Sequence, residues 1–140
     1  MKKLLLVLAL FSGGWASAQT MCPPPQLKAF HNEQQIRTAG SALTSAITLK
    51  LVSDPACPTA VSYQIKKAEM TLVRGRRPIL PARTYQGVTI DLTDFAQHAQ
   101  PGDRLYIEVL EMVGTPAGGQ PKTERSTDTD PIALNWVLTK

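Results

Sequence analysis

Apolar and polar residues alternate along several short stretches of the chain, and proline or glycine separates one stretch from the next. A period of two indicates β-strands with one buried face. The alternation predicts strands over Ala42–Val52, Tyr63–Val73, Val88–Leu92, Leu105–Met112 and Ile132–Leu138. Between the third and fourth segments, apolar residues at helical spacing predict one short helical turn, which Thr93 is placed to cap. The pattern favours an all-β, antiparallel β-sandwich.

The second of these segments changes phase part-way along its length. Tyr63 and Ile65, before the two lysines, have odd numbers, whereas Ala68, Met70 and Leu72, after them, have even numbers. Because a slip of one residue turns the core face of a strand outward, we infer a β-bulge near the two lysines. We expect the bulge and its cations to protect an exposed sheet edge.

Other segments give weaker patterns. Gln26–Arg37 fits neither period well and is interpreted as a weak edge strand and loop. Gly114–Asp130 contains several glycines and prolines, and it predicts a long hairpin loop. Leu105–Met112 carries apolar residues in both phases, which predicts a central strand covered on both faces. Trp136 stands at strand spacing in the last segment and is predicted to lie in the core.

The first residues have the pattern of an export signal. Lys2 and Lys3 precede an apolar run, Leu4–Phe11, and Ala16–Ala18 supplies small residues for cleavage before Gln19. The apolar run is shorter than the roughly 20 residues needed to span a bilayer. We therefore expect a mature chain without a transmembrane segment, either periplasmic or secreted.

Cys22 and Cys57 are the only cysteines, an even number in a chain predicted to enter an oxidising compartment. A bridge between them closes a loop of about 35 residues, which adds roughly 3 to 4 kcal/mol on the chain-entropy model. Free or intermolecular thiols remain the alternative. The C-x-x-C spacing of thioredoxin-like redox sites is absent, and Met21, before Cys22, does not fit a lipidation site.

Two blocks of the sequence carry a family resemblance. They are YQIKKAEMTLVRGRRP, from Tyr63, and DLTDFAQHAQPGDRLYIEV, from Asp91. Both resemble the C-terminal, immunoglobulin-like domain of the GldM gliding-motility family, a periplasmic component of the type IX secretion machinery of Bacteroidota. Ala39–Leu43 and Ile132–Asn135 also fit that domain's order of elements. The resemblance implies an immunoglobulin-like sandwich and partners among type IX secretion or gliding components.

The resemblance also sets the expected domain organisation. We predict a signal peptide over residues 1–18, an N-terminal arm over 19–38 and the GldM C-terminal-like sandwich over 39–140. The family's membrane helix, helical domain and preceding β domains are not expected in this chain, so its motor-coupling role is not carried over.

Charge gives one candidate site. The formal net charge of +4 includes Lys2 and Lys3, so the mature chain is only mildly basic, which argues against nucleic acid as a partner. The arginines and tyrosine that follow the bulged segment are the candidate partner-binding residues: Arg74, Arg76, Arg77, Arg83 and Tyr85. Guanidinium groups present a planar fork suited to carboxylates or phosphates. A solvated hairpin loop whose charges aid solubility is the alternative.

The sequence contains no pattern typical of an active site. A G-x-S-x-G elbow is absent, and His31 and His98 lack the spacing of zinc ligands. Asp128 and Asp130 lack the rhythm and glycine of an EF-hand. We therefore predict no enzyme, metal or cofactor. The first hypothesis is an exported protein–protein interaction module that binds another envelope protein. The alternative is a stand-alone structural or glycan-binding sandwich unrelated to secretion.

Overall fold

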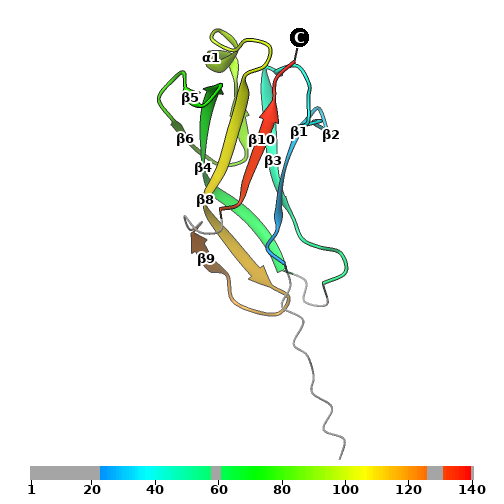
Figure 1. The fold of residues 1–140 in the computed structure, drawn as a ribbon. Coiled ribbons are helices and arrows are strands. Elements are labelled where there is room, and N and C mark those ends of the chain that lie inside the picture. Colours follow the sequence, from blue (N-terminus) through cyan, green and yellow to red (C-terminus); the bar gives the residue numbers. More distant parts are fainter. Residues whose placement is uncertain (1–22, 58–60, 126–130, 140) are drawn as a thin grey trace, which may run out of the picture.

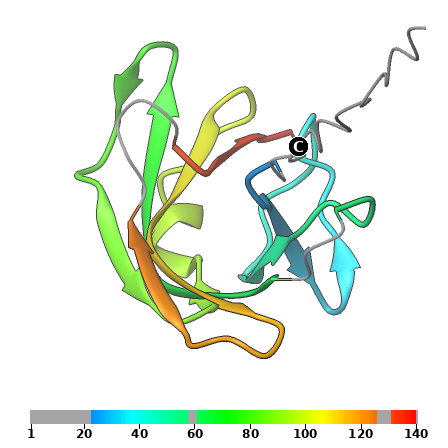
Figure 2. The same cartoon turned by 90° about the horizontal axis from the view of Figure 1, so that it is seen from below.

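Two antiparallel β-sheets face one another in the computed structural model, which describes residues 23–57, 61–125 and 131–139 (Figures 1 and 2). The four-stranded sheet has the order β2 (Gln34–Gln35), β1 (Gln26–His31), β3 (Ala46–Val52), β7 (Thr89–Asp91). The six-stranded sheet has the order β10 (Ala133–Val137), β8 (Arg104–Pro116), β4 (Val61–Arg74), β5 (Arg77–Pro78), with β6 (Arg83–Gln86) also on β4 and β9 (Lys122–Arg125) on β8. Helix α1 (Thr93–Ala96) lies between β7 and β8. The predicted all-β, antiparallel sandwich with one short helical turn is confirmed.

The core lies between the sheets and consists of the inward residues of the alternating segments. Residues that expose none of their surface are Ala68, Met70, Leu72, Leu92, Phe95, Leu105, Ile107 and Trp136. Removal of this apolar surface from water is the main favourable contribution to folding. The core position predicted for Trp136 is confirmed.

The longest ladder joins β4 to β8 and contains the predicted bulge. Ile65 pairs with Met112, the next pair is Lys67 with Glu111, and Ala68 then pairs with Val109. Lys66 is therefore an extra residue on β4, which confirms the bulge at this position. Leu110 is a second extra residue, on β8. Because each strand carries one, the register on the far side of the irregularity is the same as before it.

The second bulge explains the two apolar phases of β8. Its buried residues are Leu105, Ile107 and Val109 before the bulge and Met112 and Gly114 after it. Strand β8 is central, as predicted, since it pairs with both β10 and β4. However, Met112 faces the core because the bulge shifts the alternation of β8 by one residue. Its burial therefore does not require a second layer over the outer face of the sheet.

The expected role of Lys66 and Lys67 in protecting a sheet edge stays a prediction, since no described strand pairs with Val61–Ile65 on the side away from β8. From Lys67 onward, β4 pairs with β6 on the side away from β8, starting at the pair of Lys67 with Gln86. The bulge therefore lies where the free edge of β4 ends and the pairing with β6 begins.

The sandwich begins before the predicted boundary at residue 39. Strand β1 pairs with β3 from Gln26 to Phe30, and it buries Leu27 and Ala29 in the core. These residues give only two apolar positions in strand phase, so the periodicity of the segment is weak. Residues 26–31 thus belong to the sheet and are not part of an arm.

Two further local predictions differ from the structure. The residue that supports the start of α1 is Asp91, whose Oδ1 accepts the N–H of Thr93 at 2.9 Å, whereas the N-cap residue Leu92 makes no side-chain bond. The predicted loop from Gly114 contains the last residues of β8 and all of β9. These paired residues give no apolar alternation, because most of them are exposed.

The connection between β2 and β3 runs along β10. The N–H of Val137 donates to the carbonyl of Thr38 at 2.9 Å, and the N–H of Thr139 donates to that of Ser41, also at 2.9 Å. The indole Nε1–H of Trp136 donates to Ser41 Oγ at 2.8 Å. This connection thereby ties the end of the six-stranded sheet to the four-stranded sheet.

Candidate functional site

The arginine-rich segment forms a tight hairpin between β4 and β5. Arg74 pairs with Arg77 across the hairpin, so Gly75 and Arg76 form a two-residue turn. Gly75 has a φ of +64°. A positive φ at the first turn position is typical of type II′ hairpins, where glycine is favoured. The predicted loop is therefore an ordered turn at the end of a long strand.

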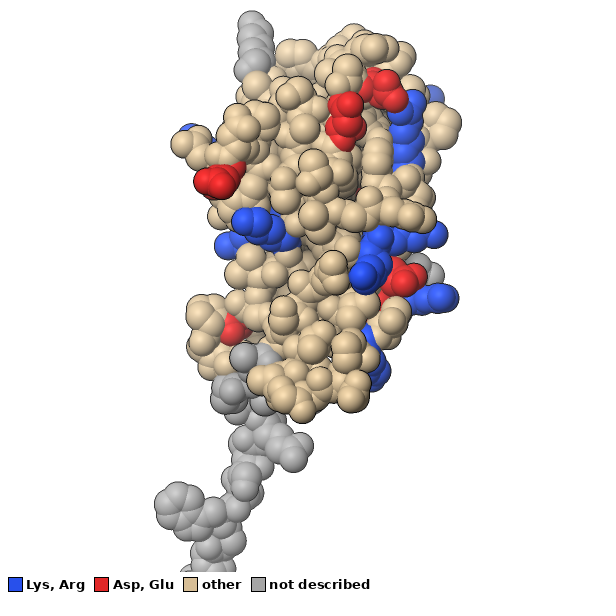
Figure 3. All heavy atoms as spheres, turned by 180° about the vertical axis from the view of Figure 1, so that it is seen from behind, with Lys and Arg blue, Asp and Glu red and all other residues tan. Residues whose placement is uncertain are grey.

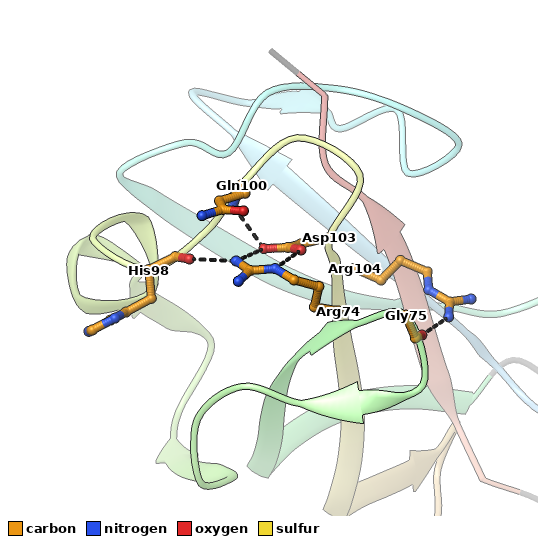
Figure 4. Close-up of polar contacts among 6 residues, drawn as sticks. All are labelled: Arg74, Gly75, His98, Gln100, Asp103 and Arg104. Atoms are coloured by element: carbon orange, nitrogen blue, oxygen red, sulfur yellow. Dashed lines mark hydrogen bonds and ion pairs between the residues drawn. The ribbon is translucent and has the colours of Figure 1, made fainter.

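Arg74 is held by a buried carboxylate (Figure 4). Its Nε lies 2.8 Å from Asp103 Oδ1 and its Nη2 lies 2.9 Å from Oδ2. Nη2 also donates to the carbonyl of His98 at 3.1 Å. Asp103 is only 2% exposed, and its Oδ2 accepts the N–H of Gln100 at 2.8 Å. Arg74 therefore fastens the end of β4 to the turn before β8, while its side chain stays 44% exposed.

The turn that supplies this carboxylate has the chemistry predicted for Pro101–Asp103. Gly102 has a φ of +91°, and the N–H of Asp103 donates to the carbonyl of Gln100 at 3.0 Å. A second arginine supports the hairpin, since Arg104 Nη2 donates to the carbonyl of Gly75 at 2.7 Å (Figure 4). The hairpin is thus fixed by one contact at its base and one at its turn.

The bond from the Arg74 guanidinium holds the pKa of the Asp103 carboxyl below its usual value, and the N–H of Gln100 acts in the same direction, although burial opposes both. Since the pKa is lower in the folded state, the ionised carboxylate stabilises the fold above the unfolded pKa of about 3.9. That contribution is lost as the pH falls through the lower folded value.

We expect Asp103→Asn to reduce the free energy of unfolding near neutral pH, and we expect the difference from the unmodified protein to shrink as the pH falls below about 4. Urea denaturation between pH 7 and pH 2.5 measures this difference. Glu33→Gln, at an exposed carboxylate, is the matched control. A difference that stays constant across this range would contradict the proposed ionic contribution of Asp103.

The structure separates the predicted arginines into three settings. Arg74 binds Asp103, whereas Arg76 and Arg77 are exposed and make no ion pair with any other described residue. Arg83, on β6, forms an ion pair with Asp94. The sequence did not show which of these arginines have intramolecular partners, nor that Arg83 lies in a strand.

Arg83 and Tyr85 line a polar cleft of about 390 Å³ beside α1. The Arg83 guanidinium lies 5.7 Å from the ring centroid of Phe95, and the Tyr85 ring lies 6.5 Å from it. Burial raises the pKa of the Tyr85 hydroxyl. Because Asp91 and Asp94 also line the cleft, its carboxylates outnumber its cation and it is not suited to an anionic ligand.

A second cleft, of about 430 Å³, lies on the outer face of the six-stranded sheet at the paired bulges. It is lined by Lys66, Lys67, Gln86, Glu111, Val113 and Thr123. The change of phase in the sequence predicted the bulge at these lysines but gave no indication of a site. The available signal was two consecutive lysines within a strand.

The comparison with known protein families bears directly on this fold. The family model described as the GldM C-terminal domain matches residues 23–126. The chain belongs to this family. The family resemblance predicted from the sequence is thereby confirmed, and the match includes β1, in agreement with the earlier start of the sandwich. No curated protein and no solved structure matches the chain.

Several predictions for this GldM C-terminal domain fall outside the described residues. They concern the signal peptide over residues 1–18, Cys22, and the acidic pair Asp128 and Asp130. Cys57 is not a free thiol, but its pairing with Cys22 stays a prediction. In the described ranges, no helix has the length and apolar character needed to cross a membrane.

Proposed function

We propose that this GldM C-terminal domain is a non-catalytic, exported module that binds another envelope protein, in association with type IX secretion or gliding-motility components. Family membership supports that association. The signal-like first residues support export, and the absence of an active-site motif in the sequence supports a binding role without catalysis.

The observation that carries this proposal is the fixed hairpin that presents Arg76 and Arg77. Both side chains are exposed at one end of the long ladder, while Arg74 and Arg104 hold the backbone beneath them. A preorganised loop loses little conformational freedom on binding. Two guanidinium groups held in this way are suited to bidentate contact with carboxylates on an acidic protein surface.

We expect Arg76→Glu combined with Arg77→Glu to reduce partner recovery about tenfold or more, because attraction to an acidic surface becomes repulsion. The measurement is affinity purification from native envelope extract with the mature, oxidised protein as bait, followed by mass spectrometry. Arg37→Glu combined with Lys122→Glu gives the same change in net charge at two other exposed positions. Thermal unfolding of each variant verifies that the domain remains folded.

The outcomes of this purification separate the two functions considered. Loss of gliding or type IX secretion proteins in the hairpin variant alone supports the proposal. Unchanged recovery in that variant overturns the hairpin as the contact surface. Recovery of no envelope protein, together with binding on a glycan array, favours the structural or glycan-binding alternative.

A further inference from the structure

The paired bulges place two consecutive lysines on the solvent side of the six-stranded sheet. In a regular strand, successive side chains point to opposite faces. Lys66 and Lys67 are instead both exposed, and the residues on either side of them, Ile65 and Ala68, are both buried. A bulge is a common means of redirecting side chains in this way.

The neighbouring strands extend the lysine pair into a row across the sheet. Lys67 is paired with Gln86 on β6 and with Glu111 on β8, and Glu111 is paired with Arg125 on β9. The next row contributes Val113 and Thr123, which line the same cleft. Four strands therefore contribute to one concave surface, which we call the bulge cleft.

The bulge cleft has more cations than carboxylates in its lining. The ammonium groups of Lys66 and Lys67 form no ion pair with a described residue, and neither does the guanidinium of Arg125, which is separated from Lys67 by Glu111. Glu111 is the one carboxylate that lines the cleft. Figure 3 shows Lys and Arg side chains gathered along one side of the face seen from behind, with Asp and Glu side chains among them. The two lysines that line the cleft thus outnumber its carboxylate, and neither forms an ion pair with it.

The acidic residues near the cleft restrict where a negatively charged ligand fits. Glu69 and Glu108 are paired directly with each other across β4 and β8, on the side of Lys67 toward the arginine hairpin. Like charges at such positions repel one another and any carboxylate brought close to them. A bound acidic segment is therefore attracted where it lies against Lys66 and Lys67. It is repelled at the next row of the sheet, where Glu69 and Glu108 lie.

Another pair of lysines provides a contrast on the opposite sheet. Lys28 and Lys50 are cross-strand neighbours on β1 and β3. The Lys50 ammonium lies 4.7 Å from the centroid of the Phe30 ring, so it already has a favourable contact within the molecule. Neither lysine lies in the bulge cleft. Lys28 and Lys50 carry the same charge as Lys66 and Lys67 but lie outside the cleft, so they serve as a control pair.

We propose that the bulge cleft binds an acidic, extended segment of a partner protein, with carboxylates placed against Lys66, Lys67 and Arg125. This inference deepens the proposed binding function by adding a second surface, and it does not use the arginine hairpin. The inward curve of the cleft and its lining by Gln86, Val113 and Thr123 favour a polypeptide over the flat surface of a membrane. Side-chain amide and hydroxyl groups are also able to bond the backbone of an extended segment.

The test is a titration of the mature, ¹⁵N-labelled protein with a synthetic decapeptide of alternating glutamate and threonine, followed by NMR. We expect amide shifts at the residues that line the bulge cleft. Lys66→Glu combined with Lys67→Glu should weaken binding about tenfold or more, whereas Lys28→Glu combined with Lys50→Glu should change it less than about twofold. Glu111→Gln should strengthen binding about threefold, because it removes the carboxylate of the cleft.

Three outcomes would overturn the inference. The first is equal weakening by the two charge reversals, which indicates an effect of net charge alone. The second is a set of shifts centred on Arg76 and Arg77, and the third is binding to phosphatidylglycerol vesicles without binding to the peptide. The variant with Arg76→Glu and Arg77→Glu leaves the bulge cleft intact. Unchanged partner recovery with that variant would overturn the arginine hairpin as a contact surface, and the peptide titration would still test the bulge cleft separately.

Discussion

Replacement of Trp136 by alanine is expected to lower the free energy of unfolding by about 4 kcal/mol, the largest effect of any single change considered. The side chain is fully buried between the sheets. Its removal therefore leaves a cavity in the core. It also removes the 2.8 Å bond to Ser41, which joins β10 to the connection between β2 and β3. Urea denaturation of the purified domain measures the loss.

Two milder changes separate the contributions of Trp136. Trp136→Phe keeps most of the buried aromatic area but removes the Nε1–H donor, and Ser41→Ala removes the acceptor alone. We expect Ser41→Ala to cost about 1 kcal/mol. If Trp136→Ala were no more destabilising than Ser41→Ala, packing of the indole ring in the core would contribute little to the free energy of unfolding.

Removal of the predicted bridge, by Cys22→Ser combined with Cys57→Ser, is expected to cost about 3 kcal/mol. The bridge would connect the segment before β1 with the loop between β3 and β4, so it would restrict the unfolded chain over a loop of about 35 residues. Urea denaturation of the oxidised protein and the double variant gives the difference in unfolding free energy.

The oxidation state provides the control for the cysteine prediction. The oxidised protein in the presence of a reductant should approach the stability of the double variant, while the double variant itself should not respond to the reductant. Equal stability of the oxidised protein and the double variant would show that the cysteines do not cross-link this loop. Mass spectrometry of the unreduced protein would then locate any alternative pairing.

The strands that could be predicted are those in which large apolar residues recur at every second position. Strands β3 and β10 have one covered face, so the period of two is visible in their sequences. Strand β4 revealed its bulge because small and large apolar residues change phase around Lys66. The matching bulge in β8 stayed hidden, because Leu110 is apolar and obscured the change.

Other features depend on pairing between distant residues. β1 could not be recognised as a core strand from Leu27 and Ala29 alone, since its strand conformation depends on pairing with β3. Likewise, the sequence placed Arg74 among the candidate binding residues, but Asp103 is 29 residues away and the link between them exists only in the folded sheet. Local periodicity carries no information about such partners.

The position of β10 in the six-stranded sheet has a consequence for the timing of folding. This strand is the last of the described chain, and it supplies both the end of the sheet and the fully buried Trp136. Domains form cooperatively once their contacts are available, and synthesis delivers the chain from its N-terminus. A nascent chain that does not yet include β10 therefore lacks the residue that closes its core. The domain is expected to remain open to chaperones until nearly all of it has been delivered.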